Sequence, residues 1–142
     1  MFIDQFYQLN NGRIGFTREQ GSNFAKQVAD DFNPIHDIDA RRFCIPGDLL
    51  FSIILARYGL SRHMEFRFTG MVAGGTALRL PCDAADTFSV QDSAGKAYLE
   101  VTRQGKVSRE EGVVESLIRA YVAFSGQNFP HILVPLMQRH GA

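Results

Sequence analysis

The 142-residue sequence has no tryptophan, only two cysteines and no surplus of either charge, with 15 Lys and Arg against 15 Asp and Glu. This neutrality argues against a nucleic-acid-binding protein, because contacts to phosphates require an excess of basic side chains. Cys44 and Cys82 match no metal-ligand spacing, so we predict two packed thiols and no metal site. A chain of this length also buries enough surface to fold without a disulfide.

Long hydrophobic stretches are absent as well. The longest uncharged apolar run, residues 49–56, is much shorter than the roughly 20 residues that a membrane-spanning helix needs. Near the N-terminus, Asp4 stands where a secretory signal would carry Lys or Arg, and no apolar segment of signal length follows. The sequence therefore predicts a cytoplasmic protein with no membrane partner.

What the chain does have is 45% hydrophobic residues, with 12 Phe and 4 Tyr among them. This composition is typical of one compact globular domain. We assign residues 1–130 to that single domain and residues 131–142 to a short apolar C-terminal tail.

The first third of the chain carries clear turn and helix signals. Residues 10–12, Asn-Asn-Gly, predict a hairpin between two short strands. Thr17 and Gln20 have the spacing of a capping box, so a helix should begin there. Its predicted apolar face includes Phe32, and it should stop by Asn33 because a proline follows.

The rest of the domain reads as one helix and a sheet. Residues 47–59 are apolar almost all the way round, which predicts a helix that other elements must cover. Alternating and β-branched segments predict five strands after it, at residues 64–72, 76–80, 87–92, 97–104 and 113–124. The economical architecture is an α+β fold in which a bent antiparallel sheet wraps around one buried helix.

The segment Asp31-Phe32-Asn33-Pro34-Ile35-His36 is the most informative for chemistry. A carboxylate and an imidazole five positions apart, with a proline fixing the bend between them, can converge on one water molecule. His36 is the natural proton acceptor near neutral pH, and Asp31 could orient the ring, polarise the water or donate a proton. The alternative is that these are ordinary loop residues after a helix, with a solvated histidine.

This Asp-x-Asn-Pro-x-His order, followed by Pro-Gly and an apolar helix, resembles the hot-dog-fold (R)-specific enoyl-CoA hydratases and MaoC-like dehydratases. The chain is also similar to a bacterial branch related to that family. The resemblance implies a hot-dog fold, with Asp31 and His36 as a catalytic pair that adds one water across a trans-2-enoyl thioester. It also implies that the backbone N–H of Gly47 holds the thioester oxygen, with Asn33 and Pro34 supporting the loop.

The sequence departs from the family at the start of the buried helix. Pro46-Gly47-Asp48 stands where these hydratases usually have His-Gly-Met, so Asp48 is either a helix-start residue or a site-lining one. Ser52, one turn further along, is a second candidate lining residue. Arg41 and Arg42 are candidate contacts for CoA phosphates or are surface residues. They are also the cations expected to offset an acidic loop that includes Asp30, Asp31, Asp37, Asp39 and Asp48.

Three functions are consistent with these residues. The first is a hydratase that converts trans-2-enoyl thioesters of CoA or acyl-carrier protein to 3R-hydroxyacyl thioesters, without a cofactor. The second is a non-catalytic module that binds or senses acyl thioesters, favoured by Asp48 and by the missing histidine. The third is a hot-dog thioesterase. In each case we expect a homodimer, because hot-dog domains commonly pair their sheets edge to edge.

Overall fold

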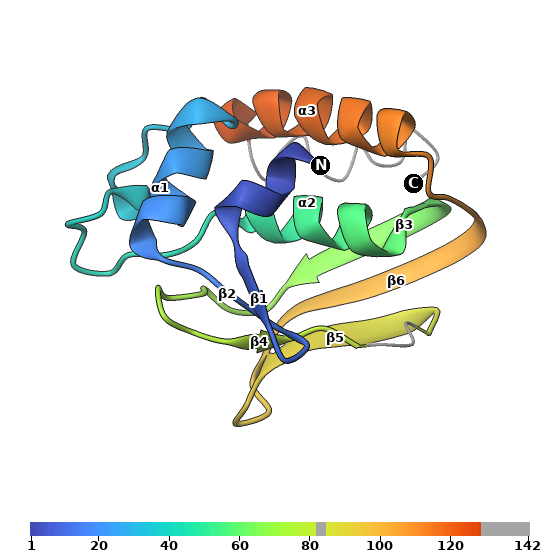
Figure 1. Ribbon diagram of the computed structural model, residues 1–142, viewed down its shortest axis with the longest axis horizontal. Coiled ribbons are helices and arrows are strands. Elements are labelled where there is room, and N and C mark those ends of the chain that lie inside the picture. Colours follow the sequence, from blue (N-terminus) through green and yellow to red (C-terminus); the bar gives the residue numbers. More distant parts are fainter. Residues whose placement is uncertain (82–84, 129–142) are drawn as a thin grey trace.

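The computed structural model describes residues 1–81 and 85–128. Within these residues the chain forms six strands, three α-helices and two short 3₁₀ helices (Figure 1). In chain order they are η1 (Phe2–Phe6), β1 (Gln8–Asn10), β2 (Arg13–Gly15), α1 (Arg18–Gln27), η2 (Pro34–His36), α2 (Gly47–Tyr58), β3 (Leu60–Phe68), β4 (Leu78–Arg79), β5 (Thr87–Asp92), β6 (Ala97–Ser108) and α3 (Glu111–Asn128).

The strands form one antiparallel sheet in the order β1-β2-β4-β5-β6-β3. The longest pairing joins β3 to β6, with Leu60 opposite Ser108 and Phe68 opposite Leu99. All three α-helices lie on the same side of the sheet, and α2 lies between the sheet and α3 (Figure 1). The fold is therefore α+β, with helix α2 as its central layer.

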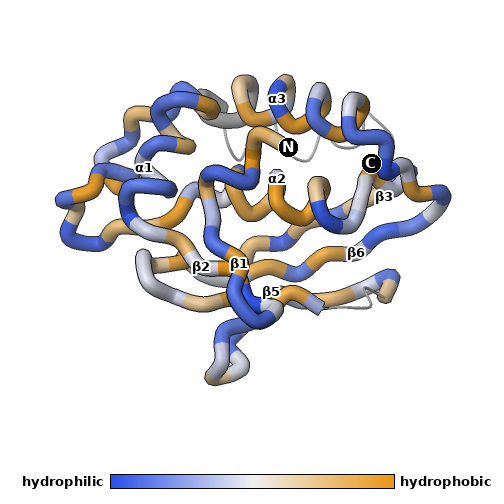
Figure 2. Tube along the Cα trace, viewed as in Figure 1, coloured by the Kyte–Doolittle hydropathy of each residue, from blue (hydrophilic) through white to orange (hydrophobic). Residues whose placement is uncertain are grey.

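Helix α2 confirms the buried helix expected at residues 47–59. Its side chains from Leu49 to Leu55 are no more than 3% exposed. Val90, Leu99 and Val101 of the sheet are fully buried and belong to the same apolar core. Hydrophobic segments of the sheet backbone lie beneath α2 (Figure 2). The helix ends at Tyr58 and is capped by Gly59. Gly59 has a φ of 83°, which suits glycine, and a Cβ there would lie 2.7 Å from the carbonyl oxygen of Ser108.

Helix α3 replaces the strand that we predicted at residues 113–124, so that prediction is wrong. The buried residues Val114, Ile118, Tyr121 and Val122 follow the period of a helix and not the alternation of a strand. They pack on α2, where the rings of Tyr121 and Phe51 have centroids 4.1 Å apart. α2 is thus covered by the sheet on one side and by α3 on the other.

Helix α1 begins as predicted and ends earlier. The hydroxyl of Thr17 accepts a hydrogen bond from the N–H of Gln20 (3.0 Å), and the Gln20 side chain accepts one from the N–H of Thr17 (3.0 Å). The helix ends at Gln27, because Asp30 takes a positive φ of 52° and turns the chain away. Phe32, expected on the apolar face, is instead 65% exposed.

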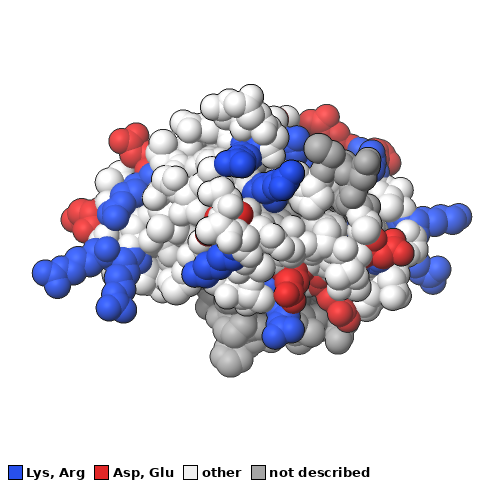
Figure 3. Space-filling model, turned by 90° about the horizontal axis from the view of Figure 1, so that it is seen from below, with Lys and Arg blue, Asp and Glu red and all other residues white. Residues whose placement is uncertain are grey.

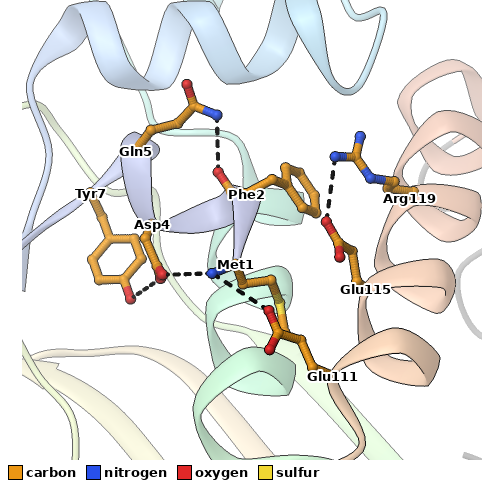
Figure 4. A network of polar contacts seen from close by, with 8 residues as sticks. All are labelled: Met1, Phe2, Asp4, Gln5, Tyr7, Glu111, Glu115 and Arg119. Carbon is orange, nitrogen blue, oxygen red and sulfur yellow. Dashed lines mark hydrogen bonds and ion pairs between the residues drawn. The ribbon is translucent and has the colours of Figure 1, made fainter.

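A network of polar contacts ties the N-terminal turn η1 to α3 (Figure 4). The Met1 amine lies 3.0 Å from the Asp4 carboxylate and 3.7 Å from that of Glu111, and the Tyr7 hydroxyl donates to Asp4 (2.9 Å). Burial alone would raise the pKa of Asp4, but the hydrogen bonds from Met1 and Tyr7 outweigh it and lower this pKa. These contacts link the two elements that flank α2.

The face of the sheet turned away from the helices carries charges of both signs. Lys and Arg side chains project near both ends of this face, with acidic side chains among them (Figure 3). None of the helices in the described ranges is long and apolar enough to span a bilayer. The predicted tail, the domain boundary at residue 130 and Cys82 all lie outside the residues that the structure describes.

Candidate active site

A cavity of about 420 Å³ opens where η2, the first turn of α2 and the end of β3 meet. It brings together Asp31, Asn33, His36, Gly47 and Asp48 from the site predicted on sequence. Its wall is completed by Ile35, Cys44, Ile45, Pro46, Leu50, Phe68, Gly70, Met71 and Val72. The cavity therefore combines a few polar groups with a mostly apolar lining, as small-molecule sites do.

The loop that carries the motif is held by hydrogen bonds from its own residues. One carboxylate oxygen of Asp31, Oδ1, accepts from the N–H of Asn33 (3.0 Å). The Asn33 side chain accepts from the N–H of Ile35 (3.2 Å), and the Asn33 carbonyl accepts from the N–H of His36 (3.0 Å). Pro34 occupies the first position of the 3₁₀ turn, where no N–H is needed. The turn thus brings His36 back toward Asp31.

His36 is a buried histidine with one ring nitrogen fixed by the backbone. The residue is 6% exposed, and its Nδ1 lies 2.8 Å from the carbonyl oxygen of Cys44. A carbonyl oxygen can only accept, so Nδ1 carries a proton and donates it. In the neutral ring, Nε2 is then the nitrogen with the lone pair, which is the form that a general base requires.

The Nε2 atom of His36 lies 3.5 Å from Oδ2 of Asp31. This separation exceeds the usual 2.7–3.2 Å of a direct hydrogen bond. With neutral His36, both atoms are acceptors, and a molecule that donates two hydrogen bonds satisfies both. A water molecule between them would be oriented and polarised by Asp31 and would give its proton to His36.

Cys44 is a cavity residue whose place beside His36 the sequence did not indicate. It is buried, as expected for a packed thiol, and its Sγ lies 3.8 Å from Nδ1 of His36. Burial, and then the negative charge of Asp31, raise the pKa of this thiol. A raised pKa keeps the sulfur protonated, so Cys44 is suited to packing and not to nucleophilic attack.

Gly47 and Asp48 form the first turn of α2 and border the cavity. The N–H groups of a first helical turn have no carbonyl partner within the helix, and they form the positive end of the helix dipole. A Cβ at Gly47 would lie 3.3 Å from the ring of Phe68, which leaves little room for a side chain. Asp48 is half-buried and lines the cavity.

A family model matches residues 1–142 over the whole chain, and its description is "Protein of unknown function (DUF3581)". The chain belongs to the DUF3581 family. No curated protein and no solved structure matches it.

Three of the predicted site residues of the DUF3581 chain do not line the cavity. Ser52 is fully buried, and its hydroxyl donates to the carbonyl oxygen of Asp48 (2.7 Å), so it holds the first turn of α2 and is not a lining residue. Arg41 and Arg42 are exposed on the loop before α2, outside the cavity lining.

The acidic loop of this DUF3581 chain is offset by cations that the sequence did not reveal. Lys26 of α1 forms an ion pair with Asp37 at 3.0 Å. Arg18 donates to the backbone carbonyls of Ile38 (2.8 Å) and Ala40 (2.9 Å). The expectation that only Arg41 and Arg42 balance this loop is therefore wrong, because α1 packs alongside it. In the described part of the chain, no group of three or more His, Cys, Asp or Glu residues could hold a metal ion.

Proposed function

We propose that this protein hydrates trans-2-enoyl thioesters to 3R-hydroxyacyl thioesters, and also catalyses the reverse dehydration. The observation that carries the proposal is the 3.5 Å approach of His36 Nε2 to Asp31 Oδ2 at a cavity that Gly47 also lines. These are three of the positions that match the hydratase family, and the resemblance assigns to them the catalytic pair and the oxyanion donor.

The architecture supports the hot-dog fold that the resemblance implies. The central helix α2 is buried against a six-stranded antiparallel sheet, and the motif loop leads into its first turn. We therefore propose a hot-dog fold together with this reaction.

In the proposed reaction, a water donates hydrogen bonds to Asp31 Oδ2 and His36 Nε2. His36 takes a proton as the water oxygen forms its bond to C3 of the enoyl group, and the electrons of the C2–C3 double bond move to the thioester carbonyl. The enolate then takes the proton from His36 at C2, which restores the neutral imidazole. Addition of the water is complete and needs no oxidant, reductant or cofactor.

The negative charge of the enolate needs a donor at its oxygen. The N–H of Gly47 and the positive end of the α2 dipole are suited to that role, because preorganised donors stabilise charge that develops in the transition state. Arg41 and Arg42, exposed outside the cavity, are the proposed contacts for the phosphates of CoA or of a carrier protein.

The test follows the loss of enoyl absorbance when the purified protein is mixed with trans-2-enoyl-CoA of short and medium chain length. We expect hydration by the wild type and a loss of at least about a hundredfold in Asp31→Asn and His36→Ala, as is usual for a general base. Asp39→Asn, an exposed change on the same loop, is the matched control and should keep the wild-type rate. Equal rates in the wild type and both site variants would contradict the proposal.

A second function is favoured by Asp48. Its carboxylate borders the cavity beside Gly47, where negative charge opposes an enolate. A module that binds acyl thioesters without turnover would tolerate this charge. It would gain thermal stability from saturated acyl-CoA, because a ligand of the folded state stabilises that state, yet it would form no hydration product. Release of free thiol from the same saturated acyl-CoA would instead indicate a thioesterase.

A further inference from the structure

Strand β3 forms one edge of the sheet, and its outer side pairs with no other strand among the described residues. Its inner side pairs with β6, and this pairing is regular from His63 to Phe68. The nine residues of β3 include no Pro and no Gly. A short strand, a proline or a bulge is a common way in which proteins protect a sheet edge, and this part of β3 has none of them. β3 is therefore a template for another strand.

The pairing with β6 determines which backbone groups face the open edge. The N–H of Thr69, just after β3, donates to the carbonyl of Tyr98, so the backbone of Thr69 faces β6. Because these groups alternate in direction along a strand, those of Met64, Phe66 and Phe68 face outward. A strand that binds this edge would form its hydrogen bonds with these three residues.

The solvent face of β3 carries one acidic and one basic side chain, on either side of Phe66. The side chain of Glu65 is 71% exposed and that of Arg67 is 80% exposed. Within the chain, Glu65 lies 3.3 Å from His63 and Arg67 lies 3.8 Å from Glu100. Such exposed pairs hold their side chains weakly, so both charges can also interact with a partner strand.

We infer that β3 binds β3 of a second copy of this chain in antiparallel register, with Phe66 opposite the partner's Phe66 on the twofold axis. In this register Glu65 of each copy lies opposite the partner's Arg67, so two pairs of opposite charge form across the interface. A shift of the axis by one residue would set Glu65 opposite Glu65, or Arg67 opposite Arg67, and like charges directly opposite are destabilising. Larger shifts lose both Glu–Arg pairs. The charges of the edge thus select the register centred on Phe66.

The same register satisfies the outward backbone groups of this segment. Phe66 bonds to the partner's Phe66, and Met64 of each copy bonds to the partner's Phe68. Phe68 also lines the candidate active site. The interface therefore reaches the wall of the cavity, although the pairing of the strands does not depend on the proposed reaction.

Disulfide cross-linking tests the register, in a Cys82→Ser background that retains the buried Cys44. Glu65→Cys and Arg67→Cys proteins are mixed under reducing conditions and then oxidised. We expect a disulfide dimer that joins one variant to the other, because facing positions of this kind lie about 4.5 Å apart at Cα. Either variant alone should not cross-link, since its two cysteines would lie more than about 7 Å apart.

Intact mass spectrometry identifies which two variants have joined. Glu100→Cys, on the same face of the neighbouring strand β6, is the matched control and should form no disulfide dimer. A mixture of the Glu65→Cys and Arg67→Cys proteins that cross-links no more than this control would overturn the inference. So would either of these variants if it cross-linked with itself as fast as with the other.

Exchange of the two charges tests the same contact by sedimentation equilibrium. Glu65→Arg sets basic side chains opposite each other and Arg67→Glu sets acidic ones, so each should raise the dimer dissociation constant at least about tenfold. The double variant restores opposite charges and should return to within about threefold of the wild type. Arg79→Glu, an exposed reversal on β4, should leave the constant unchanged.

Three results of this measurement would overturn the inference. They are a wild type that is monomeric across micromolar concentrations, single variants that dimerise as tightly as the wild type, and a double variant that dimerises as weakly as the single ones. None of them depends on whether the protein hydrates an enoyl thioester, so the strand pairing and the proposed reaction can fail separately.

Discussion

At the scale of single residues, Asp31 and His36 each use one polar atom for support and present the other at the cavity. Asp31 Oδ1 is held by the N–H of Asn33, and His36 Nδ1 is held by the carbonyl of Cys44. The remaining atoms, Oδ2 and Nε2, approach each other at 3.5 Å. This division fixes the rotamers of both side chains and the tautomer of the histidine in advance. Such preorganisation is what the proposed reaction needs.

The charge of Asp31 can be detected through the neighbouring thiol. We expect alkylation of Cys44 by N-ethylmaleimide, in a Cys82→Ser background, to be slow at neutral pH, because burial and the Asp31 charge raise the thiol pKa and the thiolate is the reactive form. Asp31→Asn removes the charge and keeps an oxygen for the N–H of Asn33. It should therefore lower the pKa of Cys44 and move the pH profile of alkylation to lower pH.

The control for this measurement is Asp39→Asn, which removes a charge from an exposed position on the same loop. Its profile should match that of the parent protein. If Asp31→Asn and Asp39→Asn give the same profile, the thiol does not sense Asp31, and the contact between the motif and Cys44 is contradicted.

At the scale of elements, the first turn of α2 supplies the N–H that the proposed reaction needs. Gly47→Pro removes this N–H, and the backbone accepts proline there because Pro46 has φ −57° and ψ 133° and the first helical position suits proline. Gly47→Ala adds a Cβ in the same place, 3.3 Å from Phe68, but keeps the N–H. In the hydration assay we expect Gly47→Pro to lose about 10²–10³-fold in kcat beyond Gly47→Ala, as for removal of one oxyanion donor. Equal kcat values in two folded variants would contradict the role of this N–H.

A helix or strand can be predicted from the sequence when local signals determine it, and less well when tertiary packing does. The capping box at Thr17 and the apolar run of α2 are local, and both predictions are confirmed. The strand predicted at 113–124 failed because β-branched and aromatic content outweighed a helical spacing that was present, Val114-Ile118-Tyr121-Val122. Within the site, the motif predicts Asp31 and His36 by its order. Cys44 lies beside His36 because of the path that the loop takes, and Lys26 reaches Asp37 because α1 packs against that loop. No local sequence pattern encodes either arrangement.

The helical assignment of α3 predicts different costs for two substitutions in the same helix. Ile118 is fully buried against α2, whereas Val113 is 44% exposed. Ile118→Ala should lower the free energy of unfolding by about 2–5 kcal/mol through lost burial and the cavity left behind. Val113→Ala should change it by less than about 0.5 kcal/mol, because the site is exposed and alanine favours a helix. Urea denaturation measures both, and equal losses would contradict this packing.

At the scale of the whole molecule, the sheet has two unequal edges. β1 ends one side with 3 residues, and β3 ends the other with 9. The N–H of Thr69, just after β3, donates to the carbonyl of Tyr98 in β6. Because N–H directions alternate along a strand, the N–H of Phe66 faces the open edge. Among the described residues, no strand pairs with this outer edge of β3. A long edge of this kind invites a second strand, and the proposed homodimer would cover it.

The dimer prediction is tested by sedimentation of the wild type and of two variants at Phe66. We expect the wild type to sediment at twice the monomer mass of 15.9 kDa. Phe66→Ala removes the ring and keeps the edge N–H, so it should remain dimeric. Phe66→Pro also removes the N–H, which an edge strand tolerates but a strand pairing through it does not, so it should sediment as a folded monomer. A wild type that stays monomeric across micromolar concentrations, or a Phe66→Pro protein that stays dimeric, would show that the β3 edge does not join two copies.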